Sequence, residues 1–120
     1  MKSRDPVRYA VVGQGHIAQV AVLPAFQHAA NCELAALITG NDIKGRELAE
    51  MYSVPAYGYD EFEEALQRER ITAVYIAVPN TLHRDFTERA GRGGVHVLCE
   101  KPMATTEADC HAMIRACERA

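Results

Sequence analysis

Short apolar segments alternate with longer segments of helical periodicity along the chain. The apolar segments are rich in β-branched residues and predict buried strands at residues 8–13, 32–39, 56–58, 73–78 and 95–99. The intervening segments predict helices at residues 15–30, 42–52, 60–66 and 81–91, with Asp60 capping the third, and a last helix capped by Thr105 or Thr106. Because proline lacks a backbone donor, Pro24 should kink or split the first helix.

Strands that are continuously apolar and alternate with helices predict a parallel sheet covered on both faces. Right-handed crossovers favour an α/β doubly wound parallel sheet, the Rossmann fold, with strand order 3-2-1-4-5. We expect residues 1–6 to be a flexible leader and residues 7–120 to form the domain. A chain of 120 residues is long enough for one core of this kind.

Composition and charge exclude several classes of partner. The formal net charge of −3 at pH 7 argues against nucleic acid or an anionic membrane as the main partner. No apolar run approaches the ~20 residues of a membrane span, and the N-terminus lacks the apolar segment of a signal peptide. The four cysteines form no CxxC motif and no metal-like pairing with histidine, so we predict buried free thiols, no metal site and a reducing, cytoplasmic location.

The segment GQGHIA follows the first predicted strand and opens the first predicted helix, as a dinucleotide-binding loop does. Gly13 would permit the tight turn, and Gly15 would let the backbone approach a pyrophosphate. The helix begins at His16 and Ile17, whose N–H groups would face the anion. The alternative for this segment is a glycine turn that binds nothing.

The segment ITGND ends the second predicted strand ~20 residues further on, where a dinucleotide-binding fold contacts the adenosine ribose. A carboxylate there would favour NAD and repel a 2′-phosphate. The chain instead has Thr39, Gly40 and Asn41, with Lys44 nearby, and their hydroxyl, amide and ammonium groups can donate to phosphate. We therefore predict NADP as the cofactor. NAD remains the alternative because Asp42 is acidic, although it is also a candidate helix cap.

The segment VPNTLH ends the fourth predicted strand at the same edge of the sheet. Pro79 and Asn80 are expected to lie along the nicotinamide half of a bound cofactor. Asn80 is also a candidate helix cap, which is compatible with that role. His83, near the start of the following helix, is either part of the site or a surface residue.

The segment HVLCEKPM sets two charged residues at the tip of an apolar strand. Glu100 and Lys101 follow the strand at once, and Pro102 fixes the backbone beside them. One interpretation is a strand that ends in a solvated turn. In the other, strand five ends at the cofactor crevice, and a lysine partly desolvated beside the cofactor transfers a proton to or from a hydroxyl. We predict that Lys101 is catalytic and that Glu100 orients it.

The segments GQGHIA, PNTLH and CEKPMAT, in this order and spacing, resemble the N-terminal nucleotide-binding domain of the Gfo/Idh/MocA oxidoreductase family. ALITGN and AVYIAVPNTLH are most similar to its glucose–fructose oxidoreductase branch. The resemblance runs from about Val7 to the end of the chain and implies a nicotinamide cofactor, a sugar or cyclic polyol substrate and hydride transfer at a ring carbon. It places Lys101 at the lysine of the family's EKP motif and Ala18 at the third position of its glycine loop.

Members of that family continue into a second α/β domain, which supplies the substrate pocket and the oligomer interface. The resemblance therefore implies the NADP-binding domain of a sugar oxidoreductase, with a sixth strand and the second domain missing, a sugar substrate only in a longer chain, and little activity in the isolated chain. Strand five would then be an exposed edge, so we expect a homo-oligomer formed through residues 95–103 and the final helix. The alternatives are a stand-alone, non-catalytic dinucleotide-binding or redox-sensing module, and a flavin or S-adenosylmethionine site at the glycine loop.

Overall fold

The computed structural model describes residues 5–120, so most of the predicted leader lies outside the described part of the chain. The strands are β1 (Val7–Val12), β2 (Cys32–Thr39), β3 (Ala56–Gly58), β4 (Ala73–Ile76) and β5 (His96–Cys99). The α-helices are α1 (Leu23–Ala25), α2 (Asp42–Tyr52), α3 (Phe62–Arg68), α4 (His83–Arg92) and α5 (Glu107–Glu118). Shorter helical turns are η1 (Ala18–Val22), η2 (Phe26–His28), η3 (Tyr59–Glu61) and η4 (Asn80–Leu82).

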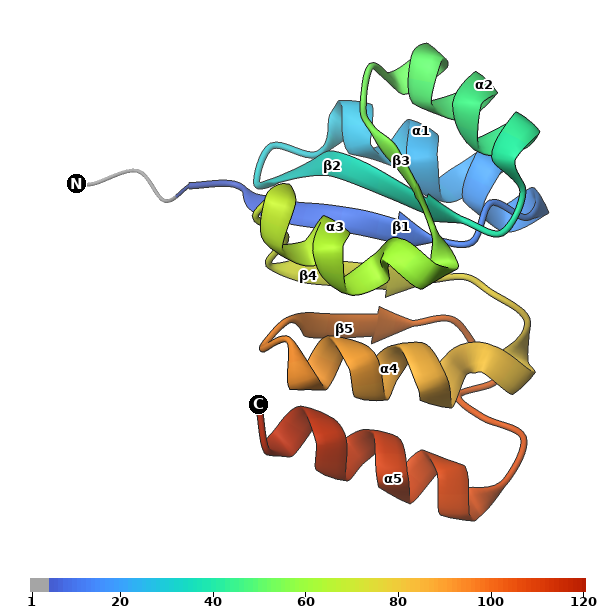
Figure 1. Cartoon of the computed structure of the whole chain (residues 1–120), viewed down its shortest axis with the longest axis vertical. Helices are drawn as coiled ribbons and strands as arrows, with labels where there is room; N and C mark the ends of the chain where they lie inside the picture. The colour runs from blue at the N-terminus through green and yellow to red at the C-terminus, as the bar shows by residue number, and fades with distance from the viewer. Residues whose placement is uncertain (1–4) are drawn as a thin grey trace.

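All five strands form one parallel sheet in the order β3-β2-β1-β4-β5, which confirms the predicted doubly wound fold and its strand order. Helices α1 and α2 lie on one face of the sheet and α3 and α4 on the other (Figure 1). Adjacent residues of the central strand β1 point to opposite faces: Val11 belongs to the core under α1 and α2, and Val12 to the core under α3 and α4. No helix in residues 5–120 is long and apolar enough to cross a membrane.

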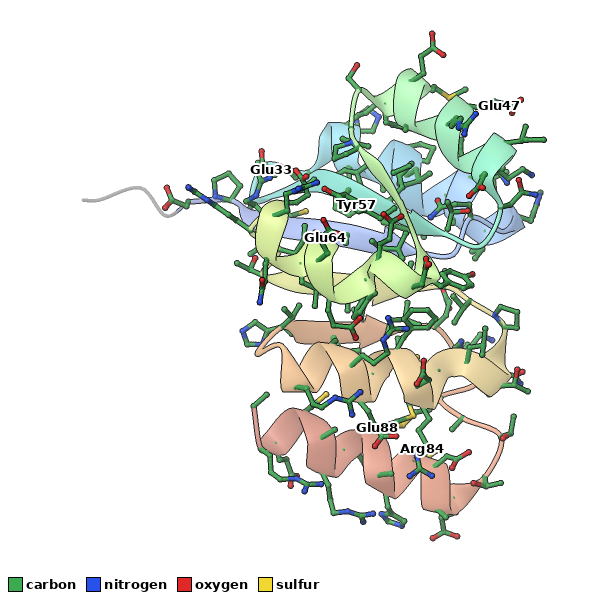
Figure 2. The ribbon with its side chains drawn as sticks, viewed as in Figure 1. Glu33, Glu47, Tyr57, Glu64, Arg84 and Glu88 are labelled. Carbon is green, nitrogen blue, oxygen red and sulfur yellow. The ribbon has the colours of Figure 1, made fainter. Side chains whose placement is uncertain are left out.

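Helix α5 lies beyond β5 at the end of the sheet and packs along α4 (Figure 1). The two helices approach closely at Gly91, where a Cβ atom would lie 2.8 Å from the carbonyl oxygen of Ala116. Figure 2 shows Arg84 and Glu88 on the side of α4 that faces α5. The guanidinium of Arg84 binds Glu88 and also Asp109 of α5, each at 2.7 Å.

The first helix is divided, as Pro24 predicts, and the division takes the form of a π-helical turn. The N–H of Leu23 donates to the carbonyl of Ala18, five residues back, so the turn η1 is wider than an α-helical one. The widened turn precedes the residue that has no N–H to donate and whose ring would crowd an α-helical carbonyl. The helix then tightens into η2 and ends at Ala29.

The predicted cap of the third helix is wrong. Asp60 lies inside the short turn η3, and the side chain of Glu61 instead accepts a hydrogen bond of 2.9 Å from the N–H of Gly58. Glu61, three residues after Gly58, therefore makes the contact of a capping box with the Gly58 backbone. Asp60 is exposed to solvent.

Arg89 of α4 binds residues of α3 and of the turn before it. Its guanidinium donates to the two carboxylate oxygens of Glu63 at 2.6 and 2.7 Å and to the carbonyl of Tyr59 at 2.7 Å. The same group lies 5.0 Å from the ring centroids of Phe62 and Phe86, and the side chain is only 16% exposed. The hydrogen bond to Arg89 lowers the pKa of Glu63, which shows that the ionised pair is the favoured state.

We therefore predict that Arg89→Met lowers the free energy of unfolding by about 2 kcal/mol, because it removes three charge-assisted hydrogen bonds and two cation–π contacts. Urea unfolding followed by circular dichroism measures the change. Arg68→Met is the control, since Arg68 pairs at 3.5 Å with Glu64 and both side chains are exposed. That substitution should cost less than about 0.5 kcal/mol. Equal losses in the two variants would contradict the role given to Arg89.

Candidate functional site

The four predicted segments lie together at one edge of the sheet, because the strands are parallel and their carboxyl ends share that edge (Figure 1, right side). Backbone hydrogen bonds extend the ladder beyond the strands. Gly13 N–H donates to Ile38 at 2.8 Å, Ala77 N–H donates to Val12 at 2.8 Å, and Glu100 N–H donates to Ile76 at 2.9 Å. The starting points of the four loops are therefore fixed relative to one another.

Gly13 and Gln14 give the glycine loop its shape. Gly13 has φ +92°, and a Cβ atom there would lie 2.7 Å from the carbonyl oxygen of Ala77, so both the turn and the packing require glycine. Gln14 is 8% exposed, and its amide donates to the carbonyls of Val11 and Ile38, both at 3.0 Å. Gln14 thus ties the loop to the ends of β1 and β2. This role was not foreseen, although a polar residue between two loop glycines is a signal for it.

Gly15 differs from Gly13, because no atom lies within 4 Å of the position that its Cβ would occupy. It precedes the first helix, whose first backbone bond runs from Gln19 N–H to the Gly15 carbonyl at 3.1 Å. The N–H groups of His16 and Ile17 come before that bond and have no acceptor within the helix. Both residues are exposed at the positive end of the helix dipole. An anion can approach the backbone here.

The end of β2 differs from expectation at Thr39. Its side chain is only 5% exposed, and its Cγ2 fills the space beside Gly45. Its hydroxyl accepts from the N–H of Asn41 at 3.0 Å and donates to the carbonyl of Asn41 at 3.1 Å. This local turn uses the hydroxyl that was expected to face the ribose.

Asn41 and Lys44 present the polar groups at this end of the sheet. The side-chain oxygen of Asn41 accepts a hydrogen bond of 3.0 Å from Lys44 N–H, so Asn41 caps α2 and Asp42 is the first residue of the helix. Asn41 and Gly40 are exposed, and Lys44 is half-buried. A Cβ atom on Gly40 would lie 2.9 Å from the ring of Tyr59, so packing against Tyr59 accounts for this glycine.

Pro79 and Asn80 are exposed after β4, whereas His83 is 1% exposed. Its Nε2 lies 2.8 Å from the carbonyl oxygen of Val78, and its Nδ1 lies 2.9 Å from that of Pro102 and 3.1 Å from that of Met103. His83 is therefore not a surface residue, and backbone carbonyl oxygens lie within hydrogen-bond distance of both of its ring nitrogens. It links the loop after β4 to the loop after β5, a role that was not foreseen.

Glu100 faces Tyr75 and the backbone of Lys101. The hydroxyl of Tyr75 donates to one carboxylate oxygen of Glu100, and the other accepts from Lys101 N–H at 3.3 Å. Among residues 5–120 no ion pair joins the Glu100 carboxylate to the Lys101 ammonium. Glu100 was expected to orient the Lys101 side chain, but it contacts the Lys101 backbone instead. The Lys101 side chain is exposed at the edge where the four loops meet. The peptide bond between Lys101 and Pro102 is cis.

Burial, together with the nearby charge of Glu100, raises the pKa of Tyr75 to about 12 from 10.0. Tyr75 is favoured as the neutral donor, so its contribution to stability is complete below about pH 10 and is lost as the pH rises towards 12. We predict that the alkaline titration of phenolate absorbance contains a step near pH 12 that Tyr75→Phe removes. If Tyr75→Phe instead removed a step near pH 10, the bond to Glu100 would not exist in solution.

The chain is similar to known proteins in both sequence and structure. Residues 7–120 match the model of an oxidoreductase family, Gfo/Idh/MocA, with an NAD-binding Rossmann fold. The D-xylose 1-dehydrogenase (NADP(+)) 2 of Haloferax volcanii is 33% identical over 112 residues, which are 93% of this chain and 34% of that relative.

Two solved structures share the fold closely. The aldose-aldose oxidoreductase from Caulobacter crescentus, complexed with glycerol, superimposes with a TM-score of 0.90 and 43% identity over 95% of this chain and 35% of that chain. A 3-ketoreductase from Actinomadura kijaniata, in complex with NADP and TDP-benzene, superimposes with a TM-score of 0.85 and 31% identity. The superposition covers 96% of this chain and 35% of that chain. The present chain spans about a third of the length of these relatives.

Proposed function

Because the chain belongs to the Gfo/Idh/MocA oxidoreductase family, with its NAD-binding Rossmann fold, we propose that residues 7–120 form the NADP-binding domain of a sugar oxidoreductase. The proposed reaction transfers a hydride between NADP(H) and a sugar or cyclic polyol. Relatives named for the oxidation of xylose and for aldose chemistry support the substrate class. A relative named for NADP(+) and a similar structure that contains NADP support the cofactor, with NAD as the alternative.

The single observation that carries the proposal is Gly15. Each of the other seven glycines has a positive φ angle or a neighbouring atom within 3.1 Å of its Cβ position. Gly15 has neither, although it lies between the turn at Gly13 and the helix start at His16. A glycine that the fold does not require fits a ligand that approaches the backbone, and the exposed N–H groups beside it suit a pyrophosphate.

The remaining site residues suit the two halves of a dinucleotide. We place the adenosine ribose and its 2′-phosphate over the backbone of Thr39 and Gly40, beside Asn41 and Lys44, because an amide and an ammonium are available there. We place the nicotinamide half along Pro79 and Asn80, so that it reaches the loop of Glu100 and Lys101. His83 supports this half indirectly, through its contacts with both loops.

The bound cofactor would supply or accept the hydride. Lys101 is exposed at the nicotinamide end, and its amino group can donate a proton to the substrate oxygen as an ammonium or accept one as a neutral amine. In the oxidative direction the neutral amine of Lys101 would accept the hydroxyl proton and become an ammonium. A cofactor held by the glycine loop and the loop after β4 would supply the hydride acceptor, so the sugar would leave as a carbonyl compound. Lys101 is the feature that favours an enzyme over a non-catalytic or redox-sensing module, because cofactor binding alone does not need it.

Titration of the 120-residue chain with NADPH and NADH, followed by calorimetry or nicotinamide fluorescence, tests the proposal. We expect both to bind and NADPH to bind more tightly. No detectable binding of either at millimolar concentration would refute it.

Cofactor preference can be tested at Asn41, whereas Thr39 is unsuitable because it is packed against Gly45. An aspartate at position 41 can still accept from Lys44 N–H and cap α2, but it places a carboxylate where the 2′-phosphate is proposed to lie. We predict that Asn41→Asp weakens NADPH relative to NADH by at least about tenfold. The dissociation constants of the two cofactors measure the change, and an unaltered thermal midpoint is the control. An unchanged preference would contradict this placement of the phosphate.

We further propose that the sugar site requires protein beyond this domain and that the chain forms homo-oligomers along β5. Support for the second point is that β5 is the edge strand and that Leu98, Met103 and Ile114 are large exposed apolar residues near it. Sedimentation at micromolar concentration tests it, and a monomer would contradict it.

The cysteines support a reducing compartment, which we propose to be the cytoplasm. All four are free, but the prediction that they are buried is wrong: Cys32, Cys99 and Cys110 are half-buried, and Cys117 is exposed on the outer helix α5. Burial raises the pKa of the Cys99 thiol to about 11. Cys99 therefore stays protonated and is not a second nucleophile beside Lys101.

A further inference from the structure

Lys101 lies between two anchored neighbours. The residue before it, Glu100, is held by Tyr75, and the residues after it, Pro102 and Met103, are held by His83. We propose that Tyr75 and His83 are positioning residues that together hold the Lys101 loop against the nicotinamide half of the cofactor. The identity of that ligand rests on the proposed function, whereas the anchoring of the loop rests only on contacts within the chain.

The first anchor reaches the loop from the face of the sheet covered by α1 and α2. Tyr75 is packed against the apolar core on that face. It pairs with Leu98 on the neighbouring strand β5, and the loop begins two residues after Leu98, at Glu100. From its hydroxyl, hydrogen bonds run to the Glu100 carboxylate and on to the backbone N–H of Lys101. The hydrogen bond from Tyr75 is the main cause that lowers the pKa of Glu100, which keeps the acceptor ionised.

The second anchor reaches the loop from the opposite face. His83 is in the first turn of α4, and its buried ring has carbonyl oxygens on both sides, from Val78 on one and from Pro102 and Met103 on the other. The ring nitrogen that carries the hydrogen donates to the carbonyl on its side. The buried ring itself packs between the end of the β4 segment and the loop after β5.

Both anchors come from the β4–α4 unit, which also carries Pro79 and Asn80. The lysine and the proposed nicotinamide contacts are therefore set by one rigid part of the fold, although they are ~20 residues apart in the chain. A displacement of the loop would move Lys101 relative to the nicotinamide without touching the adenosine end at Asn41 and Lys44.

Tyr75→Phe and His83→Asn in the 120-residue chain test the proposal, with Tyr57→Phe as a matched control. Tyr57 also donates from its hydroxyl to a carboxylate, that of Glu69, at 2.6 Å, but it lies on β3 (Figure 2). Order of the loop in the ligand-free chain is measured as the backbone heteronuclear NOE of the Lys101 amide. We expect it to fall in both test variants and to stay at the wild-type value in the control.

Binding provides the second readout, with NADPH and adenosine 2′,5′-bisphosphate as the probes. The test variants should bind NADPH at least about fivefold more weakly and the bisphosphate, which has no nicotinamide, within about twofold of wild type. Loss of both affinities together would show general misfolding in that variant and overturn its positioning role. A wild-type chain that binds neither probe would refute the proposed function, while the Lys101 amide would still test the anchoring. An amide as ordered in Tyr75→Phe and His83→Asn as in the wild type would overturn the inference.

Discussion

Gly13→Ala should lower the free energy of unfolding by about 3 kcal/mol or more, whereas Gly15→Ala, two residues along the same loop, should change it by less than about 0.5 kcal/mol. At Gly13 an L-residue must adopt φ +92°, which costs about 1–2 kcal/mol. Its Cβ would also lie 2.7 and 2.8 Å from the carbonyl atoms of Ala77 and 2.9 Å from the nitrogen of Val78. These are backbone atoms at the end of β4, so they can give way only if the sheet edge shifts.

Gly15→Ala, which should leave stability almost unchanged, should have a large effect on cofactor binding. A methyl group on Gly15 meets no protein atom but occupies the space in which the pyrophosphate is proposed to approach the backbone. We expect Gly15→Ala to weaken NADPH at least about tenfold in a chain that unfolds at the wild-type urea concentration. Urea unfolding and NADPH titration of the two variants measure both effects. Equal stabilities would contradict the packing at Gly13, and wild-type affinity in Gly15→Ala would remove the main support for the site.

The fold was predictable because its signals are local. Buried parallel strands are apolar on both faces, so β2 (Cys32–Thr39) could be located to the residue, and right-handed crossovers then determined the strand order. The break at Pro24 also followed from one residue. The form of that break, a π-helical turn, did not, because the choice between a kink and a wider turn depends on how the helix packs.

The position of the four loops was predictable, and the contacts within them were less so. Loops after parallel strands must meet at one edge, so the segments that carry Gly15, Asn41, Asn80 and Lys101 were expected there. Tyr75 and Glu100 are 25 residues apart in sequence, and no spacing rule pairs them. The local turn at Thr39 is different, since a threonine hydroxyl that binds the backbone two residues on is a common arrangement and could have been foreseen.

Replacing Lys101 should lower the turnover of the proposed oxidoreductase by about 10²–10⁴-fold, the usual contribution of a general acid or base. Lys101→Met keeps most of the side-chain length and removes the ammonium that is proposed to exchange a proton with the sugar. The Lys101 side chain is exposed, and neither of the anchoring residues binds it. The thermal midpoint of the domain should therefore be unchanged, and NADPH affinity should fall far less than turnover.

Lys44→Met is the matched comparison at the other end of the proposed cofactor site. Lys44 is proposed to contact the 2′-phosphate and lies far from the reacting carbon, so its loss should raise the KM for NADP and leave kcat at saturating cofactor within about twofold of wild type. Lys101→Met should show the opposite pattern, a fall in kcat with a similar KM for NADP. Steady-state kinetics of both variants separate the two roles. If Lys101→Met retained wild-type kcat, the lysine would serve only to bind, and the case for a catalytic domain over a sensing module would fail.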